Sequence, residues 1–322
     1  MTSLLSEINS NVLVTSISKK VPLIKAVKKA VKRCYKKGKV IGGDCSNNII
    51  GRYFVDDFWL MPQTEQLDTE SLINYCKQNK VKAIIPTRDG ELPFFAANAN
   101  ILNENGISIM ISSYSTVQRC LDKLLFFEVL NNINYPVIPT VANIEELSCE
   151  SYVVKERYGA GSQNIALNYL KQDAIKHASL LDSPIFQPFI NGREVSVDLY
   201  VGKDGMCKGV VARTRELVVN GESQITRTIR NEKLEIMCIK IAEHLGIYGH
   251  AIFQVLIDDQ DNYHIIECNN RFGGASSLGL TAGLDSLYWF LLESNGYSIG
   301  PELFIRSTEE KTQVRYAEDL IF

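Results

Sequence analysis

Residues 267–274 read Glu-Cys-Asn-Asn-Arg-Phe-Gly-Gly, and this stretch carries most of the information about the fold. It ends an alternating strand that follows a tight hairpin, so Glu267 and Asn269 fall on one face of that strand. Gln254 lies on the preceding strand and, in register, presents a third oxygen to the same point. Mg²⁺ takes such oxygen donors together with phosphate oxygens and water. The stretch therefore predicts a metal site across two antiparallel strands.

An arginine and two glycines follow the predicted metal ligands Glu267 and Asn269. Arg271 offers a charge for a transferring phosphoryl group, and Gly273-Gly274 allow a close backbone approach. The alternative is a polar hairpin edge without a ligand. That alternative must explain an acid, an amide and an arginine beside a diglycine, so we favour a site that handles phosphate.

Further upstream, a strand lysine precedes a loop of small residues. Val153-Val154-Lys155 has the pattern of a strand, and Gly159-Ala160-Gly161-Ser162 follows it. Glycines let backbone N–H groups converge on an anion, and a lysine on a strand can neutralise an adjacent phosphate oxygen. A surface hairpin with an unrelated lysine is the alternative, and these two features alone do not decide between the interpretations.

Residues 187–198 form another candidate element. An extended segment, a turn at Asn191-Gly192 and an alternating strand put Glu194, Ser196 and Asp198 on one face. A strand with one solvated face is the alternative, and such strands are common in antiparallel sheets.

The first third of the chain repeats one unit, which is a short run rich in Val and Ile, a turn and a stretch with helical periodicity. This pattern predicts a doubly wound α/β domain with a parallel sheet. The first βα turn, residues 16–20, contains no glycine, which disfavours a dinucleotide cofactor. Asp44, after the second run, is expected to serve a turn or a helix cap. The predicted strands are residues 12–15, 40–43, 82–85 and 107–111.

The pattern changes near Ser115. Hairpin turns at residues 203–205 and 259–262, each between alternating strands, predict α+β structure with antiparallel sheets. A length of 322 residues suits about two domains. We therefore predict one domain at residues 1–115 and a second at residues 116–322.

Composition and charge narrow the class of protein. Hydrophobic residues make up 45% of the chain and the net charge is −3, which argues against disorder and against nucleic acid as a partner. No stretch reaches the roughly 18 apolar residues of a membrane helix, and residues 1–10 lack the order of a signal peptide, so we expect a cytoplasmic protein with no membrane partner. The eight scattered cysteines are expected to be reduced. The basic face of the helix expected near residues 21–37 is interpreted as solvated.

Together, these features resemble the ATP-grasp superfamily over most of the chain. They follow that family's order: Asp122-Lys123, Lys155 with its glycine loop, Gln187 to Glu194, and Glu267 with Asn269. With residues 85–89, Ile-Pro-Thr-Arg-Asp, and residues 269–274, the match is most similar to relatives of the carbamoyl phosphate synthase large subunit, many of which are carboxylate-amine ligases. The resemblance implies a Rossmann-like pre-ATP-grasp domain followed by an ATP-grasp fold, with a lid subdomain at roughly residues 125–186.

The resemblance also implies a role for each position. The lysines and the glycine loop would hold the ATP phosphates, the hinge would bind adenine, and an acid would bind the ribose; the implied set is Lys123, Lys155, Gly159, Gly161, Ser162, Gln187, Phe189, Ile190 and Glu194. The implied ligands of Mg²⁺, or of Mn²⁺ in its place, are Gln254, Glu267 and Asn269. The implied catalytic residues are Lys155, Arg213 and Arg271.

The leading hypothesis is that ATP phosphorylates a carboxylate and that an amine attacks the acyl phosphate, with release of ADP and phosphate. Arg213 and Arg215 are candidates to hold the carboxylate or the acyl phosphate. Arg227 and Arg230 are weaker candidates, and we interpret them as a solvated basic stretch. The alternatives are a kinase acting on a hydroxyl or carbamate, and an ATP-binding regulator without turnover.

The substrate pocket is expected where the carboxyl ends of the parallel strands face the diglycine turn. Open α/β sheets bind ligands at those strand ends, so we place the pocket between residues 16–20, 87–89 and 273–277. The expected partners are a small carboxylate and a small amine. A homodimer is common in the family that the chain resembles.

Overall fold

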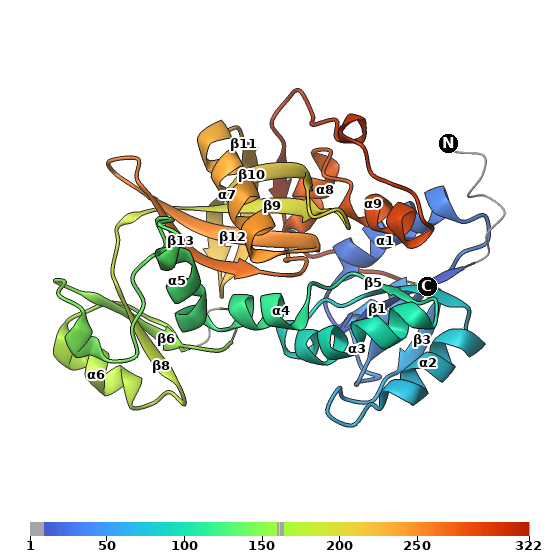
Figure 1. The fold of residues 1–322 in the computed structure, drawn as a ribbon, viewed down its shortest axis with the longest axis horizontal. Helices are drawn as coiled ribbons and strands as arrows, with labels where there is room; N and C mark the ends of the chain where they lie inside the picture. Colours follow the sequence, from blue (N-terminus) through green and yellow to red (C-terminus); the bar gives the residue numbers. More distant parts are fainter. Residues whose placement is uncertain (1–9, 160, 162–163, 322) are drawn as a thin grey trace.

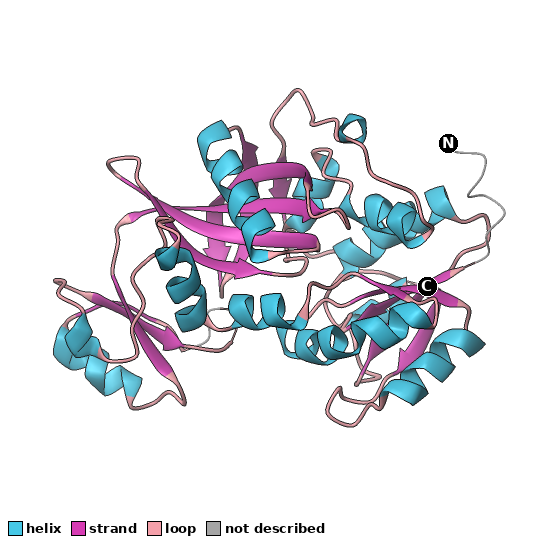
Figure 2. Cartoon of the chain, in the orientation of Figure 1, coloured by secondary structure: helices cyan, strands magenta, loops and turns pink. Residues whose placement is uncertain are grey.

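The computed structural model describes residues 10–159, 161 and 164–321, and these residues form three β-sheets. Figure 1 shows the N-terminal sheet at the lower right, a small sheet at the lower left and the largest sheet above both. Helices pack against each sheet (Figure 2). The architecture confirms the predicted combination of a parallel N-terminal sheet with antiparallel sheets after it.

The N-terminal sheet has five parallel strands in the order β3-β2-β1-β4-β5. Three of the predicted strands are confirmed, whereas the run at residues 107–111 forms only a two-residue strand, and the edge strand β3 was not predicted. The elements of this part are β1 (Asn11–Thr15), α1 (Val21–Cys34), β2 (Val40–Asp44), η2 (Ile50–Phe54), β3 (Asp57–Leu60), α2 (Thr69–Gln78), β4 (Val81–Ile85), η3 (Asp89–Glu91), α3 (Leu92–Glu104) and β5 (Ser108–Ile109).

Helix α1 joins the first sheet to the C-terminal part of the chain. It has a proline in its first turn and buries one apolar face that includes Ile24, Val27 and Val31. The same continuous core contains Val12 of β1 and Trp289 of helix α9 (Ser286–Ser294). The basic residues of α1 lie mostly on its exposed side, in agreement with the sequence interpretation.

The largest sheet has six strands in the order β13-β12-β9-β10-β11-β14. Val195 and Val197 of β9 enter a core that the helices α5 and α7 cover, while Glu194, Ser196 and Asp198 lie on the opposite face, as predicted. The elements are α4 (Tyr114–Leu121), α5 (Lys123–Asn132), β9 (Gly192–Val201), β10 (Cys207–Val219), β11 (Glu222–Ile229), α7 (Glu232–Leu245), β12 (Gly249–Asp258), β13 (Tyr263–Asn269), α8 (Ser276–Thr281), η5 (Pro301–Leu303) and β14 (Thr312–Val314).

The small sheet has three antiparallel strands in the order β7-β6-β8 and carries helix α6 on one face. Its apolar cluster includes Tyr152, Val154, Ala174 and Phe186 and is separate from the other cores of the described residues. The elements are η4 (Ile144–Glu146), β6 (Tyr152–Glu156), β7 (Ala166–Tyr169), α6 (Lys171–Ala178) and β8 (Pro184–Pro188). The predicted domain limits, including the lid at roughly residues 125–186, stay predictions.

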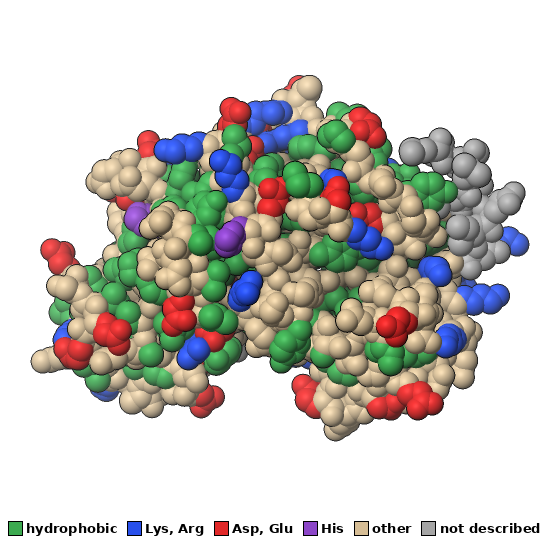
Figure 3. Space-filling view, viewed as in Figure 1, with side chains coloured by type: hydrophobic (Ala, Val, Ile, Leu, Met, Phe, Trp, Pro, Cys, Tyr) green, Lys and Arg blue, Asp and Glu red, His purple; other side chains and the backbone are tan. Residues whose placement is uncertain are grey.

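Three general expectations can be compared with the structure. Within the described part of the chain, no helix has the length and apolarity needed to cross a membrane. All eight cysteines are free thiols in the structure. Lys and Arg are interspersed with Asp and Glu over the face of the molecule seen in Figure 3.

Candidate active site

A cavity of about 1610 Å³ lies where the three sheets meet. The carboxyl ends of β1, β2 and β4 contribute Ser16, Asp44 and Thr87 to its wall, and the diglycine turn at Gly273 lies across from them. The small sheet contributes Lys155. The cavity therefore includes the predicted substrate pocket and continues to the predicted nucleotide residues.

The predicted metal ligands lie together on adjacent strands. Gln254 pairs in register with Glu267, and Asn269 is two residues further along the same face of β13. The Asn269 Nδ2 donates to Glu267 Oε1 at 2.9 Å, and all three residues line the cavity.

This donor set has one carboxylate and two amides. Accordingly, no cluster of three or more His, Cys, Asp or Glu residues suited to a metal occurs among the residues described. Mg²⁺ is usually bound through one or two carboxylates plus substrate phosphates and water, so Gln254, Glu267 and Asn269 fit this ion as part of a nucleotide complex.

Lys155 is a buried cation on the cavity wall. Its side chain is about 8% exposed and makes no hydrogen bond within the described residues. Burial lowers its pKa from 10.5 to about 8; Lys123 acts in the same direction, and Glu267 and Glu194 act against it. A buried ammonium group without a hydrogen-bond partner among the described residues is costly, and an anion in the cavity would offset that cost.

Lys123 and its neighbour Asp122 hold the start of the glycine loop. The Lys123 Nζ donates to Gly159 O at 2.9 Å, and Asp122 caps helix α5 while it accepts from Arg157 Nε at 2.7 Å. Gly159 has a φ of +130° and Gly161 one of +77°, which glycine adopts without strain. Ser162, the remaining residue predicted for this loop, lies outside the described residues.

The predicted adenine hinge leads from the small sheet into the largest one. Gln187 is buried, and its Nε2 donates to Thr140 Oγ1 at 2.8 Å. The Phe189 N–H donates to Ser151 O at 2.9 Å, while the Ile190 N–H has no hydrogen-bond partner within the described residues. The Ile190 N–H is therefore available to a ligand, whereas the Phe189 N–H belongs to the backbone of the small sheet.

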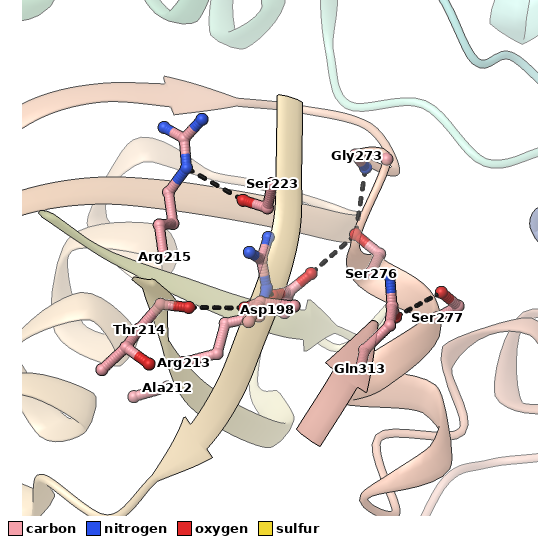
Figure 4. Close-up of polar contacts among 12 residues, drawn as sticks. Asp198, Ala212, Arg213, Thr214, Arg215, Ser223, Gly273, Ser276, Ser277 and Gln313 are labelled. Atoms are coloured by element: carbon pink, nitrogen blue, oxygen red, sulfur yellow. Dashed lines mark hydrogen bonds and ion pairs between the residues drawn. The ribbon is translucent and has the colours of Figure 1, made fainter. Parts of the chain in front are cut away.

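Glu194 and Arg215 form an ion pair at the cavity edge. Arg215 also donates from Nε to Ser223 Oγ at 3.0 Å (Figure 4) and from Nη2 to Gly221 O at 2.6 Å. Its donors are thus directed at the protein, which leaves Arg213 as the better candidate for a substrate anion. Arg227 and Arg230 do not belong to the cavity wall.

Arg213 and Arg271 occupy different parts of the cavity wall. Arg213 is buried, and its Nε donates to Asp198 Oδ2 at 2.6 Å. Arg271 forms a two-point ion pair with Asp89 of η3, which follows β4 of the first sheet, with 2.8 Å from Nε to Oδ1. Its Nη2 donates to Asn269 Oδ1 at 3.1 Å. Arg271 therefore ties the first domain directly to a predicted metal ligand.

Two residues at the strand ends were not singled out from the sequence, although Lys20 falls in the predicted pocket segment 16–20. Glu91 is fully buried and accepts hydrogen bonds from the hydroxyls of Thr15 and Ser16 and from the backbone N–H groups of residues 87 and 88. Lys20 donates to Thr87 Oγ1 at 2.8 Å, and burial followed by the nearby Arg271 lowers its pKa to about 8. Glu91 is the third residue of η3, and an acid at that position of a short helix is the signal that could have identified it.

A curated relative covers most of this chain. The carbamoyl phosphate synthase arginine-specific large chain of Eremothecium gossypii is 22% identical over 303 residues, which is 85% of this chain and 27% of that protein. The chain thus spans about a quarter of the length of that relative.

Two solved structures have a similar fold. A biotin carboxylase β,γ-ATP complex from Campylobacter jejuni has a TM-score of 0.73 and 17% identity, over 94% of this chain and 74% of that one. An L-amino acid ligase from Bacillus licheniformis has a TM-score of 0.68 and 16% identity, over 95% of this chain and 80% of that one. At these identities the likeness concerns the fold.

Family models match both halves of the molecule. Residues 12–110 match the PylC-like N-terminal domain, and residues 120–275 match the ATP-grasp domain. These matches agree with the parallel sheet, the small sheet and the cavity between them. The chain therefore contains an ATP-grasp domain at residues 120–275, preceded by a PylC-like N-terminal domain at residues 12–110.

Proposed function

We propose that this chain is an ATP- and Mg²⁺-dependent ligase that joins a carboxylate to an amine through an acyl phosphate. The observation that carries the proposal is one continuous cavity. It contains Lys155, which has no hydrogen-bond partner in the described part of the chain, the oxygen donors Gln254, Glu267 and Asn269, and a second end formed by the strand ends of the N-terminal domain. A nucleotide fills only part of such a cavity, so a second substrate has room beside it.

The nucleotide would lie between the small and largest sheets. Lys123, Lys155 and the loop at Gly159 and Gly161 are near one another and suit the phosphates. The hinge at Gln187, Phe189 and Ile190 suits adenine, and Ser162 stays part of the proposed set from the sequence alone. Glu194 suits a ribose hydroxyl through the carboxylate oxygen that Arg215 leaves free.

Bound Mg²⁺ would be held by Gln254, Glu267 and Asn269 and would neutralise phosphate charge. The protein groups do the rest by placement and charge, because phosphoryl transfer needs little covalent chemistry from the enzyme. A carboxylate oxygen attacks the γ-phosphorus and ADP leaves. The amine then attacks the acyl carbon, loses a proton and expels phosphate.

The cationic groups on the wall suit these two steps. Arg213 presents charge to the carboxylate and to the acyl phosphate formed from it. Arg271 is held by Asp89 beside Asn269, where it can stabilise the γ-phosphoryl group. The small-molecule partners and a cytoplasmic location are part of this proposal; the free thiols support a reducing compartment.

The test uses carboxylates labelled with ¹⁸O and a panel of amines. With the right pair, the protein should release ADP and transfer one ¹⁸O atom from the carboxylate to the released phosphate. Retention of phosphate on the product would identify a kinase, and AMP with pyrophosphate would refute the acyl-phosphate proposal. A protein that binds ATP but turns over no pair would instead fit the regulator alternative.

A further inference from the structure

A buried polar network lies behind Arg213, and one of its members, Ser276, also lines the cavity. Asp198 on β9 is fully buried and receives the Arg213 Nε–H at Oδ2, 2.6 Å away. Its other oxygen, Oδ1, accepts from Ser276 Oγ at 2.6 Å and lies 3.2 Å from His250 Nε2. Figure 4 shows Asp198 between Arg213 and Ser276. The sequence assigned no role to Asp198 or His250, and it placed Ser276 only within the expected pocket segment 273–277.

The hydrogen bonds determine which proton His250 carries. Its Nε2 faces the carboxylate of Asp198, so Nε2 must carry a proton and donate. Its Nδ1 then accepts from Ser286 Oγ, 3.0 Å away. Burial lowers the pKa of His250, although Asp198 opposes this effect, so the imidazole is neutral. The ring also stacks on Phe272 with 4.0 Å between centroids, which fixes its plane.

The carboxylate of Asp198 stays ionised inside this network. Burial alone would raise its pKa, but the Arg213 charge and the donors His250 and Ser276 hold the pKa well below its usual value. Asp198 and Arg213 therefore form a neutral pair with a neutral histidine beside it. Such a pair has one well-defined geometry, because every other arrangement would leave a buried carboxylate with fewer donors.

The network also reaches the diglycine turn. Ser276 Oγ accepts from the Gly273 N–H at 3.0 Å while it donates to Asp198 (Figure 4). Arg213 on β10 and the turn after β13 are thus tied to the same carboxylate. Only the Nε of Arg213 is used in this way; its two Nη groups make no hydrogen bond within the described residues, and Arg213 lines the cavity.

We propose that Asp198, His250 and Ser276 are positioning residues that hold the Arg213 guanidinium and the Gly273 turn in one fixed arrangement, so that an anion in the cavity meets a preset charge. This inference rests on the proposed function only in identifying that anion as the substrate carboxylate and the acyl phosphate formed from it. A mobile arginine would have to be ordered again in each turnover, and preset charge avoids that cost.

The first test does not depend on turnover. The Arg213 Nε–H should give a slowly exchanging signal in an ¹⁵N-correlated NMR spectrum, assigned by its loss in Arg213→Lys. In Asp198→Asn this N–H should exchange at least about tenfold faster, because a neutral amide holds a guanidinium less tightly than a carboxylate does. The control is Glu293→Gln. Glu293, on helix α9, is another buried carboxylate, and it accepts a hydrogen bond from the hydroxyl of Tyr200, which lies on β9 like Asp198. This control should leave the Arg213 signal unchanged.

The second test separates positioning from simple destabilisation. Asp198→Asn should lower kcat by roughly 30- to 100-fold and change the KM for ATP by less than about threefold, since the nucleotide residues are untouched. His250→Gln keeps an N–H donor where His250→Leu does not, so the glutamine variant should retain clearly more activity. Folding of each variant is checked by the wild-type-like NMR signals of residues away from β9.

The outcomes are distinct. Unchanged protection of the Arg213 N–H in Asp198→Asn would overturn the positioning role. Faster exchange with an unchanged kcat would overturn its link to the reaction. If the Arg213 N–H exchanges faster in Asp198→Asn but the wild-type protein joins no carboxylate to an amine, the positioning role is supported and the proposed function is refuted.

Discussion

Replacing Lys155 by methionine should make the protein more stable and inactive at the same time. The lysine is about 8% exposed, has no hydrogen-bond partner within the described residues and has a pKa lowered by burial from 10.5 to about 8. At about 1.4 kcal/mol for each pKa unit, this difference lowers the free energy of unfolding by about 3 kcal/mol. The full loss applies at any pH at which the lysine is charged in both the folded and the unfolded chain. Lys155→Met removes that loss and keeps the apolar stem.

The pH dependence follows from the direction of the pKa change. Below about pH 8 the folded and unfolded chains both carry the charge, so the full cost is present. The cost falls as the pH rises from about 8 to 10.5 and is absent above 10.5, where both states are neutral. The gain in unfolding free energy from Lys155→Met should therefore be up to about 3 kcal/mol at pH 7 and only about 1.4 kcal/mol at about pH 9.5.

The assay is urea-induced unfolding of the protein without ligands at the two pH values. The control is Lys208→Met, because Lys208 has a side chain that is only 9% exposed but is ion-paired with Asp204, and its replacement should not stabilise. ADP release by Lys155→Met should fall by about two to three orders of magnitude. A variant that is less stable than wild type at pH 7, or equally stabilised at both pH values, would refute the reasoning.

Three further predictions concern other residues of the cavity. Glu267→Gln removes the one carboxylate of the metal set, so ADP formation should be abolished while nucleotide binding stays measurable by calorimetry; normal turnover would exclude Glu267 from the metal site. Asp89→Asn breaks the two-point ion pair with Arg271, and differential scanning calorimetry should detect a loss of about 1–3 kcal/mol in stability together with a lower kcat; no change in either would show that the pair does not join the domains. Gly159→Ala places a side chain at a φ of +130°, so the KM for ATP should rise several-fold, whereas Gly205→Ala, at a φ of +77° in a remote hairpin turn, should leave that KM unchanged.

The sequence predicted the features that follow from local pattern. Strand alternation placed Glu194, Ser196 and Asp198 on one face. The hairpin turn at residues 259–262 sets the register only as far as Val255, and a bulge between Gln254 and Val255, which the sequence pattern did not predict, brings Gln254 opposite Glu267. Strand β3 was missed because Asp57–Leu60 is a short edge strand of mixed polarity, without the apolar run that marks the inner strands.

Contacts between distant parts of the chain could not be predicted in this way. The pairing of Arg271 with Asp89 joins two domains, and no spacing rule relates residues so far apart. His250 belongs to no recognisable motif, and its role depends on the placement of Asp198 and Ser276 around it. Arg215 was considered for the substrate together with Arg213, because both lie on the same segment. Its ion pair with Glu194 on the neighbouring strand could not be predicted from that segment.

The core shared by α1, α8 and α9 has a consequence for how the cavity can open. Because Val27 and Trp289 lie in one apolar core, the N-terminal domain and the largest sheet should move as one rigid body. The small sheet has its own core around Val154 and Phe186. It can therefore rotate about its connections without exposing its own core or the core that α1 shares with α9. We therefore expect the cavity to open by movement of the small sheet, while its wall at the strand ends near Thr87 keeps one shape.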